Sequence, residues 1–279
     1  MAKNSLISPI LKWVGGKRQL LTDILPRIPE NCSTYVEPFV GGGAVFFELQ
    51  PKKAIINDLN AELINVYRVV RDFPEELIRE LEHHAQRNDK DYFYKIRSMD
   101  RQLDYEQVNP IQRAARILYL NKTCYNGLYR VNSAGQFNTP YGKYKNPKIV
   151  DGAAIRAMSK YLNRKGIKIC QGDYKAVLKG LRKGAFVYFD PPYLPLSSSA
   201  SFTGYTQGGF TYKQQQELKR ECDKLRKRGI AFLLSNSDCP EIRQLYSDYT
   251  IVTVKAKRNV NSNGSARGEI NEVLIYYEE

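Results

Sequence analysis

Long hydrophobic runs and metal-binding patterns are the features that this 279-residue sequence most clearly lacks. No stretch of about 18 apolar residues occurs, so no membrane span is expected, and residues 1–11 are too short and polar for a secretory signal. The five cysteines lie far apart without a CxxC pair, and the two histidines are neighbours. A disulfide framework and a zinc site are therefore disfavoured, no metal is expected, and a reducing cytoplasm is the expected location.

Acidic residues are also scarce. The chain has 43 Lys and Arg against 29 Asp and Glu, a net charge of +14. Residues 112–168 alone hold twelve Lys or Arg and a single acid, Asp151. Such a basic face can be merely solvated, but this segment is also rich in Tyr and Asn, which contact bases and phosphates. The composition therefore favours a nucleic-acid partner.

Strand and helix patterns alternate at both ends of the chain and enclose a helical, basic middle. Strands are expected at residues 34–37, 54–56, 167–170, 186–189, 230–234, 250–254 and 272–276. Helices are expected at residues 44–49, 60–71 and 211–227 and between 74 and about 125, and a loop-rich stretch at 126–147. The alternation predicts a nucleotide-binding α/β sheet. We predict a catalytic domain of residues 1–60 and 161–279, interrupted by a DNA-binding insertion at 61–160.

A glycine loop follows the first expected strand. Gly41, Gly42 and Gly43 would let the backbone pass close to a ligand, where the next helix offers free N–H groups. Phe46 breaks the dinucleotide GxGxxG pattern. Asp58 ends the second expected strand, and an acid there can accept hydrogen bonds from ribose hydroxyls. The alternative role for Asp58 is a helix N-cap, since a helix is expected just after it. The preceding loop favours the ribose role.

The segment Asp190-Pro191-Pro192-Tyr193 follows an apolar strand pattern. Two prolines fix the turn and remove two N–H donors, which leaves turn carbonyls and the Asp190 carboxylate as acceptors. An exocyclic amine is a poor nucleophile because its lone pair is delocalised into the ring. Two acceptors that hold its hydrogens favour a tetrahedral nitrogen with the lone pair aimed at an electrophilic methyl group. Tyr193 can stack on the base plane. An ordinary strand-ending turn is the alternative for the DPP tripeptide alone.

Six motifs occur in one order along the chain: KWVGGK, EPFVGGGAVF, INDLN, NGLYRVNSAGQFNTPYGKYK, DPPYLPLS and LSNS. By itself the first is explained equally well by a core Trp with solvated lysines. Together, over nearly the whole chain, they resemble the Dam-type DNA adenine-N6 methyltransferases, closest to members that methylate adenine within GATC, including those of restriction–modification systems. The resemblance implies an α/β fold of the class I S-adenosylmethionine-dependent methyltransferases, a Rossmann-like sheet with a helical DNA-recognition insertion.

The resemblance also implies roles, position by position. The implied catalytic residues are Asp190, Pro191, Pro192 and Tyr193. S-adenosylmethionine is the implied methyl donor, without a metal, and its implied contacts are Trp13, Lys17, Phe39, Gly41, Gly43, Asp58, Asp173 and Asp190. The implied DNA contacts are Lys12, Tyr125, Asn126, Leu128, Arg130, Pro140 and Lys143.

Some of these implied roles are specific. Asp58 would bind the cofactor ribose and Asp173 its adenine. Arg130 and Lys12 resemble residues that read guanines. Lys143 stands where several relatives have Arg, which could alter a phosphate or base contact. Residues 255–267, with four cations and no acid, resemble a further DNA-contacting loop.

The sequence thus predicts methyl transfer from S-adenosylmethionine to the N6 amine of an adenine flipped out of double-stranded DNA, within GATC, in functional pairing with a restriction endonuclease but without a stable complex. An RNA adenine methyltransferase would share DPPY but lack the YNGLYR segment in a basic insert. A protein-amide methyltransferase would have Asn in place of Asp190. A catalytically inactive DNA-binding relative would not need to keep Lys17, Asp58 and Asp190 together.

Overall fold

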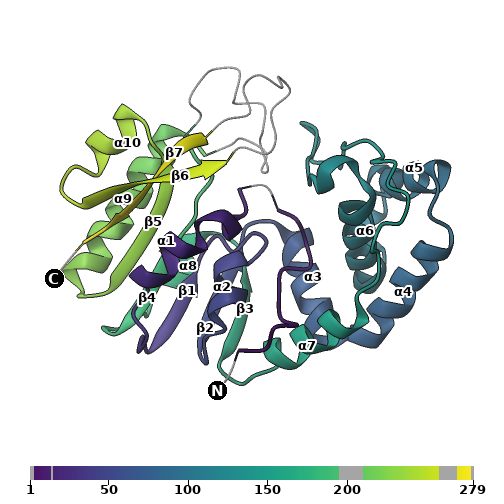
Figure 1. The fold of residues 1–279 in the computed structure, drawn as a ribbon, viewed down its shortest axis with the longest axis horizontal. Helices are drawn as coiled ribbons and strands as arrows, with labels where there is room; N and C mark the ends of the chain where they lie inside the picture. The colour runs from purple at the N-terminus through teal and green to yellow at the C-terminus, as the bar shows by residue number, and fades with distance from the viewer. Residues whose placement is uncertain (1–2, 14, 195–209, 258–268, 278–279) are drawn as a thin grey trace.

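The computed structural model describes residues 3–13, 15–194, 210–257 and 269–277. Within these residues, seven strands form one sheet in the order β3-β2-β1-β4-β5-β7-β6 (Figure 1). The parallel strands are β1 (Thr34–Glu37), β2 (Ala54–Asp58), β3 (Ile167–Gln171), β4 (Ala185–Phe189) and β5 (Ala231–Ser237). The antiparallel strand β7 (Glu269–Tyr276) lies between β5 and β6 (Thr250–Lys257). This topology is that of a class I methyltransferase sheet, as expected.

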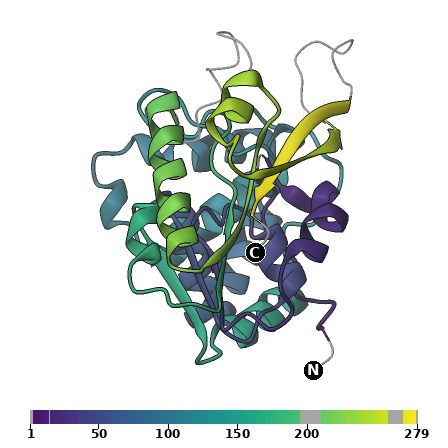
Figure 2. The same ribbon diagram turned by 90° about the vertical axis from the view of Figure 1, so that its left-hand side faces the viewer.

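Successive side chains of the central strands enter two separate cores. On β4, Phe186 and Tyr188 face one core, and Val187 and Phe189 face the other. The first core includes α1 (Leu21–Ile24), α2 (Ala44–Leu49), α3 (Ala61–Asp72) and α7 (Gly152–Leu162). The second includes α8 (Tyr174–Leu178), α9 (Tyr212–Lys227) and α10 (Pro240–Leu245), with α9 running along the sheet (Figure 2). Burial on both faces explains why β4 is apolar throughout.

The chain between β2 and β3 builds a separate group of helices, on the right of Figure 1. Its members are α4 (Pro74–Gln86), α5 (Lys90–Ser98), α6 (Pro110–Thr123) and the short 3-10 helices η3 (Met99–Arg101) and η4 (Tyr105–Gln107). Inside it, the buried Arg116 of α6 pairs with Asp100 at 2.8 Å. Helices α3 and α7 contact this group, and α3 also packs on β2 and β3. Helix α3 therefore connects the sheet to the helical group.

All expected strands and helices are present, with the strand at 34–37 and the helix at 44–49 matching to the residue, whereas α7, α8 and α10 were not expected. The last two strands are longer than expected, because the β6–β7 pairing continues from Val254 to Lys257 through residues without an apolar run. Within the loop-rich stretch, a 3-10 helix η5 (Tyr125–Gly127) and the isolated bridges Cys124–Tyr141 and Val131–Phe137 form a hairpin.

All five cysteines are free thiols. No helix in the described parts of the chain has the length and apolar character needed to cross a bilayer. The same residues contain no group of three His, Cys, Asp or Glu side chains that could hold a metal ion.

Candidate active site

The carboxyl ends of β1 and β4 meet at the centre of the sheet. The strand order reverses here, because β2 follows β1 on one side and β5 follows β4 on the other. In open α/β sheets, ligands bind outside the carboxyl ends of the strands at such a reversal. The glycine loop follows β1 and Asp190 follows β4. The topology therefore brings together two motifs that are far apart in sequence.

Lys17 and Asp190 form a mostly buried ion pair at this point. The Lys17 Nζ lies 2.9 Å from Oδ1 of Asp190, and the two side chains are 5% and 20% exposed. The same Nζ donates to the Gly15 carbonyl at 2.7 Å and lies 4.6 Å from the centroid of the Tyr193 ring. Removing one partner of such a pair would leave a buried charge without compensation. Both residues were predicted from sequence, but their pairing was not.

Asp190 is anchored through one of its two carboxylate oxygens. Ser235 on β5 donates its hydroxyl to Oδ1 at 2.9 Å, the same oxygen that Lys17 contacts. Among the residues the structure describes, none donates a hydrogen bond to Oδ2. This arrangement orients the carboxylate. Ser235 belongs to the LSNS motif, to which sequence reasoning gave no separate role.

The two prolines after Asp190 differ in how their carbonyls are used. The side chain of Gln215, fully buried on α9, donates to the Pro192 carbonyl at 3.1 Å. The side chain of Asn236 donates to the side-chain oxygen of Gln215, Oε1, at 3.0 Å. This bond fixes the orientation of the Gln215 amide. No donor to the Pro191 carbonyl occurs within the described residues. The turn is thus held through Pro192.

Tyr193 makes two contacts within the protein, one through its hydroxyl and one through the face of its ring. The hydroxyl donates to Oε2 of Glu272 on β7 at 2.6 Å, and Lys17 lies over the ring. Burial raises the pKa of Tyr193 well above its usual value, and the carboxylates of Asp190 and Glu272 raise it further. Tyr193 is therefore a neutral phenol with a fixed ring orientation. Glu272 was missed by sequence reasoning, since it lies in an otherwise ordinary strand.

Asp58 binds the glycine loop rather than a helix end. Its Oδ2 accepts the Gly41 N–H at 3.0 Å and its Oδ1 accepts the Asn60 N–H at 2.9 Å. The N-cap of α3 is Asn60, whose side chain accepts from the Leu63 N–H, so the N-cap alternative for Asp58 is wrong. Burial raises the pKa of Asp58, opposed by these backbone N–H groups. A carboxylate has about four acceptor sites, so Asp58 can still bind further donors.

Trp13 packs directly against the glycine loop. A Cβ at Gly41 would lie 3.0 Å from Cδ1 of Trp13, and one at Gly42 would lie 3.1 Å from its Cβ. Gly41 and Gly43 also have φ angles of 48° and 69°, a region that L side chains disfavour. The loop therefore needs glycine both for its conformation and for the approach of Trp13. On its other side, Trp13 stacks on Tyr129, with centroids 4.6 Å apart.

Phe39 and Asp173 lie along the same edge of the sheet. Asn57, on β2, donates to the carbonyls of Pro38 and Gly172 at 3.0 and 2.9 Å, and so ties the loops after β1 and β3 together. The Phe39 ring packs against Tyr174 with centroids 5.0 Å apart. The exposed Asp173 caps α8 by accepting the Lys175 N–H at 2.7 Å. Asn57 was quoted within INDLN but given no role, and its burial explains its importance.

The residues expected to contact DNA lie on the hairpin and next to it. The Tyr125 side chain is 53% exposed, and Asn126, Arg130, Pro140 and Lys143 are also exposed. Leu128 is partly buried. The Arg130 Nε donates to Asn138 Oδ1 across the hairpin at 2.8 Å. Lys12 is exposed and lies against Gly127, where an added Cβ would be 2.7 Å from its Cδ.

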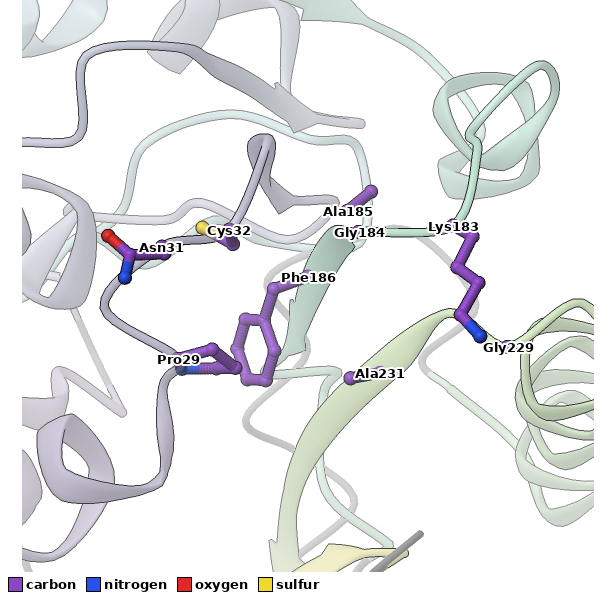
Figure 3. Close-up of a pocket in the computed structure, with 9 residues that line it drawn as sticks. All are labelled: Pro29, Asn31, Cys32, Lys183, Gly184, Ala185, Phe186, Gly229 and Ala231. Atoms are coloured by element: carbon purple, nitrogen blue, oxygen red, sulfur yellow. The ribbon is translucent and has the colours of Figure 1, made fainter.

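One further segment expected to contact DNA lies mostly outside the described residues, and one hollow lies apart from this edge. Of residues 255–267, the first three end β6 and the remainder lies outside the described residues. A hollow of about 270 Å³ lies at the opposite, amino-terminal ends of β4 and β5 (Figure 3). Its lining includes Asn31, Cys32 and Lys183 but no acid. The hollow is therefore remote from Asp190 in the fold.

Comparison with known proteins identifies the family. Residues 13–260 match the family of D12 class N6 adenine-specific DNA methyltransferases. The chain is 48% identical over 277 residues to the Type II methyltransferase M1.LlaDCHI of Lactococcus lactis subsp. cremoris, covering 99% of this chain and 97% of the relative. It is 42% identical to the Type II methyltransferase M.MjaIII of Methanocaldococcus jannaschii (96% and 98% covered) and 36% identical to the DNA adenine methylase of Escherichia coli K12 (96% and 94%). The chain belongs to the D12 class N6 adenine-specific DNA methyltransferase family and is an adenine-specific DNA methyltransferase.

Proposed function

We propose that this enzyme methylates adenine N6 within GATC in double-stranded DNA, with S-adenosylmethionine as methyl donor, as the modification partner of a restriction endonuclease in the cytoplasm. The observation that carries the chemistry is the orientation of Asp190, with Oδ1 bound to Lys17 and Ser235. The six motifs of the GATC-methylating type support the target sequence. The names of the Lactococcus and Methanocaldococcus relatives, both Type II methyltransferases, support the restriction–modification role.

The residues at the ends of β1 and β2 fit a nucleoside cofactor. The buried Asp58 keeps acceptor sites for ribose hydroxyls, and Trp13 and Phe39 offer aromatic surface on either side of the glycine loop. The exposed Asp173 has one oxygen engaged in capping and one available for an adenine amine. Gly43 and Lys17 complete the proposed set. When bound, S-adenosylmethionine supplies an electrophilic methyl group.

The proposed chemistry assigns two acceptors to the target amine. Oδ2 of Asp190 and the carbonyl of Pro191 would each accept one N6 hydrogen, which draws the nitrogen toward a tetrahedral geometry. Methyl transfer would form an N–C bond, break an S–C bond and release one N6 proton, and Oδ2, which would already accept that hydrogen, is the base we assign to it. Tyr193, held by Glu272, would stack on the extruded adenine. Pro192 acts through its carbonyl, which Gln215 fixes.

The proposed DNA contacts follow the exposure of the hairpin. Tyr125 and Leu128 would enter the duplex, and Arg130 and Lys12 would read guanine O6 and N7. The neighbouring proposed contacts are Asn126, Pro140 and Lys143. We keep the division into a catalytic domain of residues 1–60 and 161–279 and a recognition insertion of 61–160. Helix α3, at the start of that insertion, packs on β2 and β3 and so joins the insertion to the sheet.

The proposal is tested by mapping methylated adenines in cells that lack other adenine methylation. The chain and its Asp190→Asn variant are expressed separately, and their genomic DNA is sequenced at single-molecule level. N6-methyladenine is expected at GATC with the unchanged chain and at no site with the variant. Methylation at a different sequence would overturn the GATC assignment while leaving the chemistry intact. Equal methylation by both proteins would overturn the role of Asp190.

A further inference from the structure

One strand of the recognition hairpin presents side chains to two different parts of the enzyme. Leu128 and Arg130, the proposed DNA contacts, flank Tyr129, which is only 5% exposed. The Tyr129 ring stacks on Trp13 with an interplanar angle of 21° and packs edge-on against Phe137 at 5.7 Å. Neighbouring side chains of an extended strand point in opposite directions. Tyr129 therefore faces away from the proposed DNA contacts and toward the cofactor side.

From Trp13 the contacts continue into the glycine loop. Trp13 packs on Gly41 and Gly42 without room for a Cβ at either position. Gly41 donates its N–H to Asp58, and its carbonyl accepts the Tyr67 hydroxyl at 2.7 Å. Asp58, the proposed ribose acceptor, is thus connected through Gly41 and Trp13 to Tyr129 of the recognition hairpin.

A second connection runs through Asn121, which is 1% exposed on α6. Its Oδ1 accepts the Lys12 N–H at 2.8 Å, and its Nδ2 donates to the carbonyls of Lys12 and Gly127 at 2.8 and 3.0 Å. The side chain thus ties the start of the hairpin to the residue before Trp13. Because both donors of its side-chain NH₂ group and its Oδ1 bind these two segments, Asn121 fixes the register of the stack.

We propose that the Trp13–Tyr129 stack, held in register by Asn121, couples the cofactor loop to the DNA-recognition hairpin. Tyr129 and Asn121 are positioning residues in this device, and they touch neither substrate. Occupancy of the loop at Gly41 and Asp58 fixes Trp13 and, through Tyr129, the hairpin that meets the duplex. The coupling is reciprocal by thermodynamic linkage, so cognate DNA must tighten cofactor-product binding by the same factor. This inference rests on the proposed function.

The test measures coupling rather than activity. The Kd for a GATC duplex is measured with and without saturating S-adenosylhomocysteine, and the Kd for S-adenosylhomocysteine with and without the duplex. Each pair of measurements gives a coupling ratio, the Kd without the second ligand divided by the Kd with it. In the unchanged enzyme the two coupling ratios should agree and exceed about fivefold, the lower end of typical coupling. Tyr129→Leu should bring both ratios close to one. Tyr129→Phe, which keeps the stacked ring, should retain them.

Phe93→Leu is the matched control for lost packing. Phe93 is fully buried on α5, and its ring contacts Tyr94, Tyr119 and Tyr141 but not Trp13. This variant should be less stable than the unchanged enzyme but should keep both coupling ratios. If circular dichroism shows Tyr129→Leu to be unfolded, Asn121→Ser serves as the deciding variant, with the same expected loss of coupling.

The outcomes separate the inference from the function on which it rests. Coupling ratios of one in the unchanged enzyme, or unchanged ratios in folded Tyr129→Leu, would overturn the inference while leaving GATC methylation in place. A fall of the same size in Phe93→Leu would also overturn it, since any core defect would then suffice. Failure of the unchanged enzyme to bind or methylate a GATC duplex would overturn the proposed function instead.

Discussion

The catalytic edge of the sheet and the recognition hairpin present their functional side chains in contrasting ways. At the sheet edge, Lys17, Asp190 and Tyr193 are each fixed by a partner within the protein and are largely shielded from solvent. On the hairpin, Tyr125 and Lys143 extend into solvent. One region is complete before its substrate binds. The other, as we propose, is completed only when the duplex binds.

The contrast follows from what each region must do. Stabilising developing charge requires dipoles and charges that are already oriented in a shielded site, so that nothing reorganises during the reaction. Reading base edges requires donors that are free to exchange water for DNA, and phosphate contacts gain their energy from released counterions. A substitution at the sheet edge should therefore affect catalysis or folding, whereas one on the hairpin should affect selection of DNA. Four predictions test this division.

The largest effect is expected for Asp190→Asn. Asn keeps the shape of the side chain but replaces the free carboxylate oxygen and weakens the contact with Lys17. We expect kcat to fall by about 10²- to 10³-fold or more, with DNA affinity changed little. Methyl transfer is measured with tritiated S-adenosylmethionine on a GATC duplex, and binding by fluorescence anisotropy. Asp248→Asn, in an exposed ion pair with Lys219, is the control and should keep full turnover. A large fall in DNA affinity with kcat retained would contradict the division.

Lys17→Met should show that the sheet edge is also a stability element. The change leaves Asp190 shielded without its partner, which for buried pairs costs about 3–5 kcal/mol. The melting temperature should fall by at least about 6 °C. Lys148→Met breaks an ion pair with Asp151 that is largely exposed, and it should cost less than about 1 kcal/mol. Equal losses in the two variants would mean that the Lys17 pair contributes no more than a surface contact.

The sequence predicted those parts of the site that are encoded locally. The strand at 34–37, the glycine loop and the turn at Asp190 each appear as a short pattern, because strand burial, backbone freedom and proline geometry act over a few residues. The strand alternation also predicted the fold class. For Asp58 the sequence favoured a ribose-binding role over a helix N-cap, and in the structure the N-cap of α3 is Asn60.

The supporting contacts could not be predicted, because they depend on which elements become neighbours. Gln215 lies in a run of three glutamines on a polar helix, and only the packing of α9 decides which of them is buried. Ser235 meets Asp190 because β5 lies beside β4. Glu272 meets Tyr193 only after β7 inserts next to β5. Asn121 gave one usable signal, a polar residue among the apolar residues of α6.

On the hairpin, Arg130→Ala should change specificity rather than catalysis. If Arg130 reads a guanine, its loss should reduce discrimination at one base pair by about 1–3 kcal/mol and leave the other positions unchanged. Binding is compared across duplexes that differ from GATC at single positions. Lys143→Ala provides the contrast: if Lys143 contacts a phosphate, its loss should weaken binding to all duplexes alike and lower the salt dependence of binding. Uniform weakening by Arg130→Ala would make it a phosphate contact as well.

The smallest expected effect concerns pH, and it separates the catalytic edge from the helical group. Burial raises the pKa of Glu37, beneath the catalytic edge, from its usual 4.5 to about 8, although the Tyr35 hydroxyl donates to it at 2.7 Å. Folded Glu37 therefore keeps a proton that the unfolded chain loses, and stability falls as pH rises from 4.5 through 8. Burial lowers the pKa of His84, in the helical group, from 6.5 to about 4, so its contribution is lost as pH falls from 6.5 through 4.

Glu37→Gln removes the contribution of Glu37 to the pH dependence of stability. Gln can still accept from the Tyr35 hydroxyl, but it has no proton to lose. Its melting temperature relative to the unchanged enzyme should therefore rise by about 3 °C or more between pH 6 and pH 9. His84→Asn should show no such rise over this range and should differ from the unchanged enzyme in its pH dependence only below pH 6.5. Parallel melting curves for Glu37→Gln and the unchanged enzyme from pH 6 to 9 would mean that Glu37 is already ionised in the fold, balanced by Lys17. The ammonium of Lys17 would then balance the carboxylates of both Glu37 and Asp190 at the catalytic edge.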